Sequence, residues 1–414
     1  MDSSAARTAV EHLRAGVPSA GAAQMLSVGR RRILGEIEGE LLALQAGRPS
    51  RHLRIIAANY GEGKSHTLNA VRAIAAHEHF LVSQITVSRE TPLDRVDRVY
   101  RKLVSRTYYP GVERPGIDPL LHEISERPEA VQRLLRFAQT KLHPKIGHVL
   151  EARLEGKRGD IEPLDGDLSG YLLPMPALRR AYDDNMGRRL PKMDRFPLDQ
   201  RFDYLRLIDE MAVLAGLAGW LILIDEVEMI GRIGRRARAL SYALLRDLSD
   251  PARLPHTYSV AAVAASFQAD LTDRLDEAEQ LPLWLRERGQ DELADAVPGI
   301  VGLLAGAPHL PPLSEADLAE VFDGIAQAHA VAYGWSPPLT GSDLLQRIRV
   351  PLRERDIKVR QLVRAVVHFL DLTMRYGDLP QLRVHGLEEP VPAPSEADDG
   401  EFPEGDDVVR GWSG

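Results

Sequence analysis

Short runs of apolar residues recur along the chain and alternate with longer stretches in which apolar residues follow a helical spacing. Each short run has the length of a strand and is dominated by Val, Ile, Leu and Ala. Strands that alternate with helices are typical of a parallel sheet covered by helices. The pattern predicts an α/β fold whose strands are Leu53–Ala58, Phe80–Ser88, Trp220–Ile224, Tyr258–Ser266 and Gly299–Leu304.

Apolar residues three and four positions apart predict the helices between these strands. They are Ala5–Arg14, Arg31–Ala46, Lys64–Ala76, Leu93–Arg106, Arg201–Leu217 and Arg235–Leu248. Residues 109–200 hold helical pieces broken by prolines and glycines, which predicts a helical insertion. Beyond Pro311-Pro312 the pattern is helical only, over Ser314–His329, Gly341–Val350 and Val359–Arg375. Ser314 and Asp317 predict a capping-box-like start for the first of these.

A glycine-rich turn joins the first predicted strand to the helix that follows it. The turn Ala58-Asn-Tyr-Gly-Glu-Gly-Lys-Ser65 is a Walker A motif with alanine in place of the first glycine. In such a loop, backbone N–H groups wrap phosphates, so we expect Lys64 to reach the β- and γ-phosphates and Ser65 to ligate Mg²⁺. A chance glycine-rich turn is the alternative, but the strand before and the helix after are the context that the motif requires. The residues expected to bind the nucleotide here are Asn59, Tyr60, Gly61, Glu62, Gly63, Lys64, Ser65 and His66.

Two adjacent acids, Asp225 and Glu226, follow the apolar run Trp220–Ile224. We expect Asp225 to hold Mg²⁺ together with Ser65, and Glu226 to orient and deprotonate the attacking water. A solvated turn is the alternative, but a buried strand directs its end into the crevice where ligands bind. Because a glutamate here is typical of AAA+ and RecA-like ATPases rather than small GTPases, the motif favours ATP over GTP.

Further positions are candidates for sensing the γ-phosphate. Ser266 ends a strand expected between the two Walker strands, and Arg360, with Arg355 behind it, begins the last predicted helix. An ordinary strand end and a solvated helix start are the alternatives. With Lys64 and Glu226, Ser266 and Arg360 complete the predicted catalytic set. An arginine from a neighbouring subunit would be drawn from Arg274, Arg286 and Arg288, for each of which a plain surface role is the alternative.

Composition narrows the classes of function. The absence of cysteine excludes disulfides, zinc–cysteine sites, iron–sulfur clusters and a cysteine nucleophile. The longest apolar run, Met211–Ile224, is shorter than the ~20 residues of a membrane span. The first residues lack the apolar segment of a secretory signal. We therefore expect a cytoplasmic protein without a membrane partner.

Charge is unevenly distributed along the chain. The net charge is −8, and residues 388–414 hold nine acids and one base, so residues 1–387 are neutral. This tail is rich in Pro, Gly and acids and is predicted to be disordered; it could mimic nucleic acid, shield a basic surface, or only add solubility. The arginine cluster Arg232, Arg235, Arg236 and Arg238 could contact DNA phosphates or form a solvated helix face paired with acids.

Several stretches together resemble the ATP-binding protein family of the bacteriophage exclusion (BREX) defence systems, of the BrxD type. They are Leu13-Arg-Ala-Gly-Val-Pro18, Val28-Gly-Arg30, Gly61-Glu-Gly-Lys-Ser-His66, Ser88-Arg-Glu-Thr-Pro-Leu93, Leu223-Ile-Asp-Glu-Val-Glu228 and Ala328–Trp335. The resemblance implies an AAA+-like (ASCE) P-loop ATPase core, related to origin-recognition-type and STAND proteins. It also implies that Gly29 and Arg30 cover the adenine. The alanine at 58 and the acidic tail depart from the family pattern.

These features divide the chain into four expected parts. Residues 1–50 would form N-terminal helices that cover the nucleotide site, and residues 51–310 the ATPase core with its insertion at about 109–200. Residues 311–384 would form a helical lid, and 388–414 the acidic tail.

Three functions fit this organisation. The first is an ATP-hydrolysing motor or switch in phage defence, a homo-oligomer with double-stranded DNA and helicase or methylation components as partners. The second is a nucleotide-gated scaffold or oligomerisation switch with little turnover. The third, a metabolic kinase, is disfavoured by Glu226 and by the helical lid.

Overall fold

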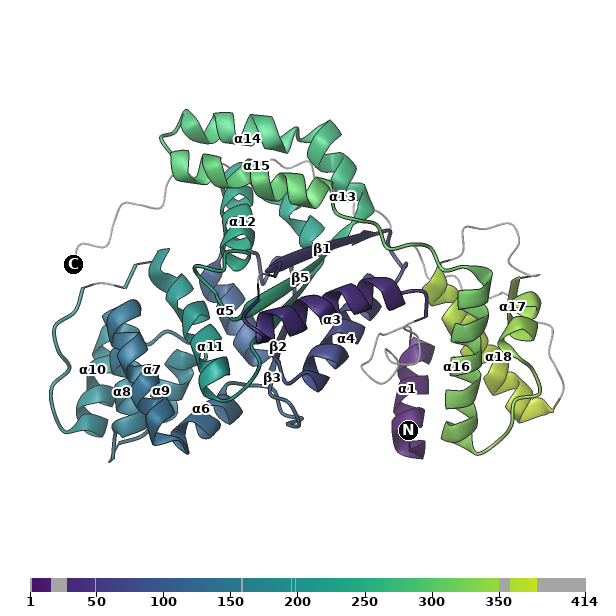
Figure 1. Cartoon of the computed structure of the whole chain (residues 1–414), viewed down its shortest axis with the longest axis horizontal. Coiled ribbons are helices and arrows are strands. Elements are labelled where there is room, and N and C mark those ends of the chain that lie inside the picture. Colours follow the sequence, from purple (N-terminus) through teal and green to yellow (C-terminus); the bar gives the residue numbers. More distant parts are fainter. Residues whose placement is uncertain are drawn as a thin grey trace.

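The computed structural model describes residues 2–15, 28–48, 50–157, 159–194, 196–197, 199–349 and 358–377. The predictions for the acidic tail and for Arg355 lie outside these residues. Figure 1 shows three parts in a row: helices of the insertion at one end, the sheet with its covering helices in the middle, and a helical bundle at the other end.

Five strands form one sheet in the order β1-β5-β4-β2-β3. Four of them, β1 (Leu53–Ala58), β2 (Leu81–Thr86), β4 (Trp220–Asp225) and β5 (Thr257–Ala264), run parallel, and β3 (Thr107–Tyr108) pairs antiparallel with β2. Every residue of β1 and β4 is buried, as expected for a parallel sheet covered on both faces. The prediction that β5 lies between the two Walker strands is confirmed.

The prediction of a strand at Gly299–Leu304 is wrong, because this segment belongs to helix α15 (Asp291–Ala305). Val297, Ile300 and Leu304 are all buried and lie on one side of that helix. A short apolar run cannot distinguish a strand from a buried helix by periodicity alone.

The chain does pass beside β1 after α15, but only briefly. The Ala57 N–H donates to the Pro308 carbonyl at 3.0 Å, and the Leu310 N–H donates to the Ala57 carbonyl at 2.7 Å. These contacts form a single parallel bridge between Ala57 and His309. Beside β1 the sheet is therefore extended by this single bridge only. The fifth strand of the sheet is the short β3.

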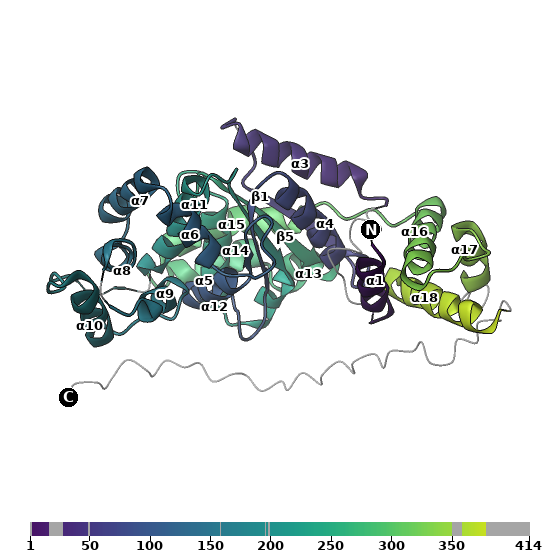
Figure 2. The ribbon, with the colours of Figure 1, turned by 90° about the horizontal axis from the view of Figure 1, so that it is seen from below.

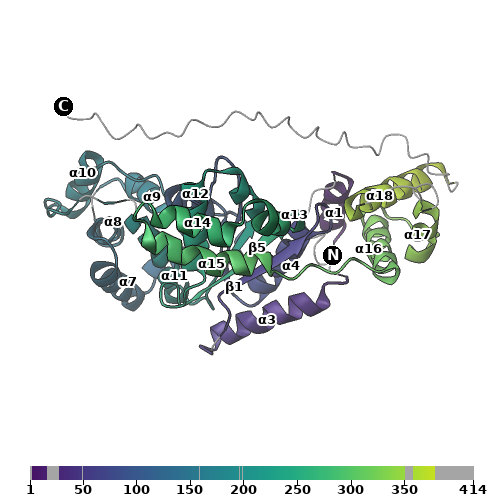
Figure 3. The ribbon, with the colours of Figure 1, turned by 90° about the horizontal axis from the view of Figure 1, so that it is seen from above.

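The two faces of the sheet form separate apolar cores. Helices α3 (Arg31–Gln45) and α4 (Lys64–His77) cover one face. Helices α5 (Val96–Ser105), α11 (Asp203–Leu214) and α12 (Arg235–Leu248) cover the other. Figures 2 and 3 show α3 on one side of the strands and α12 on the opposite side.

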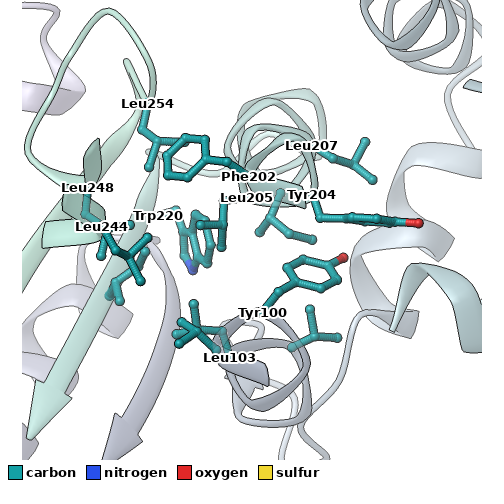
Figure 4. Packing of buried hydrophobic residues seen from close by; sticks show 14 of the residues in the cluster. Tyr100, Leu103, Phe202, Tyr204, Leu205, Leu207, Trp220, Leu244, Leu248 and Leu254 are labelled. Atoms are coloured by element: carbon teal, nitrogen blue, oxygen red, sulfur yellow. The ribbon is translucent and has the colours of Figure 1, made fainter. Parts of the chain in front are cut away.

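Trp220 occupies the centre of the second core. Figure 4 shows its ring among leucines of α11 and α12, with Tyr100 and Tyr204 nearby. Its indole N–H donates to Ser83 Oγ at 2.8 Å, so the buried ring also has its polar atom satisfied. Two short helices, α13 (Ala265–Ala269) and α14 (Glu277–Arg286), lead from β5 to α15, and α15 packs on α12.

The predicted insertion is helical throughout its regular elements. It comprises α6 (Asp118–Ser125), α7 (Pro128–Lys141), α8 (Pro144–Glu155), α9 (Glu162–Leu168) and α10 (Met175–Met186). A buried ion pair between Lys145 Nζ and Asp167, 2.6 Å apart, lies inside it. Tyr204 of α11 donates a hydrogen bond to the same carboxylate, so the insertion is tied to the core helices.

The bundle at the opposite end contains α16 (Glu315–Tyr333), α17 (Gly341–Arg349) and α18 (Val359–Tyr376), together with α1 (Ser3–Ala15). Arg14 of α1 makes two hydrogen bonds to Asp371 of α18, at 3.0 and 2.8 Å. The N-terminal region is thus divided, since α1 packs on the bundle and α3 packs on the sheet. The capping box between Ser314 and Asp317 is confirmed. No helix in the described part of the chain is long and apolar enough to cross a membrane.

Candidate nucleotide-binding site

The glycine-rich turn lies between β1 and α4, where the sequence predicts it. Gly61 and Gly63 have φ angles of 86° and 98°, which side chains with a Cβ atom rarely adopt. The Glu62 carboxylate folds back and accepts hydrogen bonds from Asn59, at 2.7 Å from its backbone N–H and 2.9 Å from Nδ2. These two hydrogen bonds help to fix the shape of the turn.

Lys64, Ser65 and Asp225 meet at the carboxyl ends of β1 and β4. Lys64 is buried and donates to the Ala58 carbonyl at 3.2 Å. Ser65 Oγ donates to Asp225 Oδ2 at 2.6 Å. The structure thus brings Lys64 and Ser65 together with Asp225, which stands 160 positions after Ser65 in the chain.

Glu226 follows directly after β4 in a left-handed conformation, with φ of 59°. Its backbone N–H donates to Asp225 Oδ1 at 2.9 Å, and its side chain lines the pocket beside Lys64. Burial raises the pKa of the Glu226 carboxyl, and the neighbouring Glu228 and Asp225 carboxylates raise it further. Such a carboxyl holds a proton more readily than a solvated one, which suits a general base.

Glu228 has a contact that the sequence does not reveal. Its Oε2 accepts the backbone N–H of Ala264, the last residue of β5, at 3.0 Å. A carboxylate three positions beyond Asp225 thereby ties the turn after β4 to the neighbouring strand.

The expectation that Ser266 ends a strand in the site is wrong. β5 ends at Ala264, and Ser266 is exposed in α13 and does not line the pocket. The chain turns into a helix here because the next two residues are anchored. Phe267 is buried, and Gln268 Nε2 donates to carbonyls near the end of α15, at 2.9 to 3.1 Å.

Helix α18 reaches the phosphate loop with its first residues. Arg360 lines the pocket, and its guanidinium lies 5.7 Å from the centroid of the Tyr60 ring. Lys358 Nζ lies 4.9 Å from the same centroid. The ring of Tyr60 therefore attracts both cations through cation–π contacts.

The other half of the pocket is apolar and is built from distant segments. Its lining residues are Leu13, Val28, Leu313, Val321, Val359 and Val363. The whole pocket, polar and apolar halves together, has a volume of about 170 Å³. In the sequence, Leu13 and Val28 stand in stretches that resemble the family, whereas the other four belong to ordinary apolar helix faces or a proline-flanked linker.

Arg30 connects this apolar half to the phosphate loop. It is 4% exposed and donates to the Glu62 carbonyl at 3.0 Å and to the Pro311 carbonyl. Burial lowers the pKa of this guanidinium, and the Glu62 and Asp317 carboxylates oppose that shift. Gly29 precedes it with φ of 71°, and a Cβ atom there would approach Leu313 to 2.6 Å. Val28 and Arg30, which flank Gly29, line the pocket, and the role of this segment over the adenine, which the family resemblance implies, stays a prediction.

Three arginines are candidates for reaching the nucleotide of a neighbouring subunit, and none of them lines the pocket of its own chain. Each has an acidic partner: Arg274 pairs with Asp270, Arg286 with Asp295 and Arg288 with Glu287.

The arginine cluster after β4 is divided. Arg238 forms a buried ion pair with Glu277 at 2.6 Å and so supports the packing of α12 on α14, whereas Arg232, Arg235 and Arg236 are exposed.

The parallel sheet and the glycine-rich turn at the end of β1 define a nucleotide-binding α/β protein of the P-loop-like type. The model of a family described as BREX system ATP-binding protein BrxC/D matches residues 2–165 and 186–386. The chain therefore belongs to this family of ATP-binding proteins from BREX phage-defence systems. No match was found among curated proteins or among solved structures.

Proposed function

We propose that this protein binds and hydrolyses ATP with Mg²⁺ and acts as a DNA-linked motor or switch in BREX defence. The observation that carries the proposal is the contact between Ser65 and Asp225, 2.6 Å apart, beside the buried Lys64 and the pocket-lining Glu226. These are the groups that phosphoryl transfer to water requires: a cation, metal-binding oxygens and a base.

The donor atoms at the strand ends suit Mg²⁺. Ser65 Oγ and Asp225 Oδ2 are hard oxygen ligands, and Mg²⁺ binds a few such ligands together with phosphate oxygens and water. Among the described residues, no group of three or more His, Cys, Asp or Glu could hold a metal ion by itself. When bound, Mg²⁺ would neutralise phosphate charge, while Lys64 contacts the outer phosphates and Glu226 takes the proton of the attacking water.

The apolar half of the pocket fits the adenine. Leu13, Val28, Val321 and Val363 all pack in the apolar cluster of the bundle. A base beside them, with its phosphates at the glycine-rich turn after β1, would hold the bundle against the core, in the manner of a lid. Arg360 would be the bundle residue that contacts the γ-phosphate, and its position in the pocket lining together with Gly61–His66 supports this role.

The test is ATP binding and phosphate release by the full chain, compared with Lys64→Ala. We expect Lys64→Ala to weaken ATP binding by about 10- to 100-fold, because a charge-assisted hydrogen bond is worth about 1.5–3 kcal/mol. Lys141→Ala, at an exposed position of α7, is the matched control and should bind as the wild type does. Equal affinities for the Lys64→Ala and wild-type proteins would contradict the proposal.

A nucleotide-gated scaffold is the second candidate function. It is supported by the origin of the pocket lining, which comes from the N-terminal segment, the phosphate loop and the bundle together. Bound ATP would therefore order these parts relative to one another and could create an interface between copies. Light scattering with and without ATP tests this, because an unchanged mass and unchanged partner binding would exclude it.

A further inference from the structure

Helix α5 and the residues around it carry an excess of basic side chains. Residues 95–114 contain six basic residues (Lys or Arg) and only two acidic residues (Asp or Glu). The helix buries Val99, Tyr100, Leu103 and Val104 against the core. Its basic residues lie on the other side of the helix, where Arg101 is exposed and Arg98 and Lys102 are half-buried.

The charges on this face are not cancelled locally. Asp97, the one acid within α5, is shared by Arg95 and Arg201, at 3.4 and 3.1 Å. Asp94, which precedes the helix, faces Arg95 and Arg98, and burial raises the pKa of its carboxyl. In the part of the chain that the structure describes, Arg98, Arg101 and Lys102 form no ion pair. These three side chains thus carry positive charge that no salt bridge neutralises, along a helix about 15 Å long, and Arg98 also faces the Asp94 carboxylate.

An exposed aromatic ring from the insertion joins this face. Tyr171, in the loop between α9 and α10, is 64% exposed, and Arg101 Cζ lies 5.4 Å from its ring centroid. The loop lies directly on α5, because a Cβ atom on Gly170 would approach Arg101 Cα to 2.9 Å. Figure 2 shows α9 beside α5 in the ribbon. The aromatic residue that a basic stretch needs for base stacking is therefore supplied by a segment about 70 positions away.

The arginines after β4 and around α14 differ from this face in their partners and in the ring beside them. Arg238, Arg274, Arg286 and Arg288 have carboxylate partners. Arg232, Arg235 and Arg236 are exposed, and no salt bridge joins them to the described residues, but the ring near them, Trp284, is only half-exposed and is already contacted by Arg288 at 4.2 Å and Arg235 at 6.0 Å. The α5 face is therefore the one that combines basic residues with a largely exposed ring, that of Tyr171.

We propose that α5 and Tyr171 form a binding surface for single-stranded DNA. Phosphates would lie along Arg98, Arg101 and Lys102, and an unpaired base would stack on Tyr171, as in proteins that combine a basic groove with an aromatic platform. The proposal rests on the DNA-linked part of the proposed function and names the surface that carries it.

The experiment measures binding of a fluorescently labelled oligo(dT) and of a duplex of equal length to the full chain, over a range of salt concentrations. The triple variant Arg98→Gln, Arg101→Gln, Lys102→Gln should bind oligo(dT) about tenfold or more weakly at low salt. Its log–log salt slope should fall by about 2, because each lost phosphate contact removes about 0.7 from the slope. The matched control neutralises three exposed cations of α7: Arg133→Gln, Arg136→Gln, Lys141→Gln.

Tyr171→Ala tests the stacking separately. It should weaken oligo(dT) binding by about 5- to 100-fold and leave duplex binding nearly unchanged. Tyr376→Ala is its control, because Tyr376 is 63% exposed and lies beside Arg375 in the same kind of contact, at the far end of the molecule.

Unchanged affinity and slope in the α5 variant, or an equal loss in the α7 control, would overturn the inference. Tighter binding of the duplex than of oligo(dT) would overturn the assignment to single strands. The two proposals fail differently. A protein that hydrolyses ATP but does not bind DNA at low salt refutes this surface, whereas one that binds DNA without hydrolysing ATP refutes the ATPase.

Discussion

Asp209 is a buried carboxyl whose ionisation should weaken the fold as the pH rises. It lies in α11, and its Oδ1 accepts hydrogen bonds from Thr257 Oγ1 at 2.6 Å and from the His256 N–H at 3.0 Å, at the start of β5. Burial raises the pKa of this carboxyl from 3.8 to about 7, although both hydrogen bonds act in the opposite direction. The folded state therefore binds the proton more tightly than the unfolded chain does.

The sign and size of the effect follow from this difference. The contribution of Asp209 to stability is fully present below about pH 4 and is lost as the pH rises through about 7. One pKa unit corresponds to about 1.4 kcal/mol, so the total loss is about 4 kcal/mol. Between about pH 5.5 and about pH 8 the loss is about 2 kcal/mol.

The assay is urea unfolding of the wild type and of Asp209→Asn at these two pH values. Asparagine keeps a carbonyl acceptor for both hydrogen bonds but cannot ionise. The stability of the variant relative to the wild type should therefore rise by about 2 kcal/mol between the two pH values. Asp184→Asn, at an exposed position of α10, should not show this change. An identical pH dependence in the wild type and Asp209→Asn would refute the reasoning.

Three further predictions concern the pocket and the bundle. Gly61→Ala should weaken binding of a fluorescent ATP analogue about tenfold, since the left-handed backbone costs about 1–2 kcal/mol and the new methyl group would meet Lys358 at 3.0 Å; unaltered binding would contradict this. Arg30→Ala should raise KM for ATP more than it lowers kcat, because Arg30 fixes the loop shape through the Glu62 carbonyl; steady-state kinetics decide this. Arg14→Gln should lower the stability by about 1 kcal/mol in thermal unfolding, because it removes the hydrogen bonds to Asp371; an unchanged midpoint would show that α1 is held by apolar packing alone.

The sheet could be predicted because its strands carry their own signal. β1 and β4 are uninterrupted buried runs that are followed by the polar residues of a motif. The sequence therefore predicts both that these segments are strands and where they end. The run at Gly299–Leu304 carries no such signal, because apolar residues fill both strands and buried helices. The edge strand β3 has two residues and no pattern of its own, since it exists only through pairing with β2.

The site shows the same division between local and distant signals. Lys64, Ser65, Asp225 and Glu226 belong to motifs with fixed spacing. The prediction for Ser266 rests on a polar residue at the end of an apolar run, and strand ends depend on packing, here the burial of the Phe267 ring. The apolar half of the pocket could not be predicted, because Leu13 and Val363 stand 350 positions apart in sequence and meet only when α1 joins the bundle.

The most direct test of the central claim compares ATP affinity and phosphate release in the wild type and Glu226→Gln, with and without DNA. The proposed ATPase predicts that the variant binds ATP as tightly as the wild type but releases phosphate at least about 100-fold more slowly, because the general base is lost. Phosphate release by Glu226→Gln at the wild-type rate would contradict the role of Glu226. Absence of turnover in the wild type under both conditions would contradict the ATPase itself.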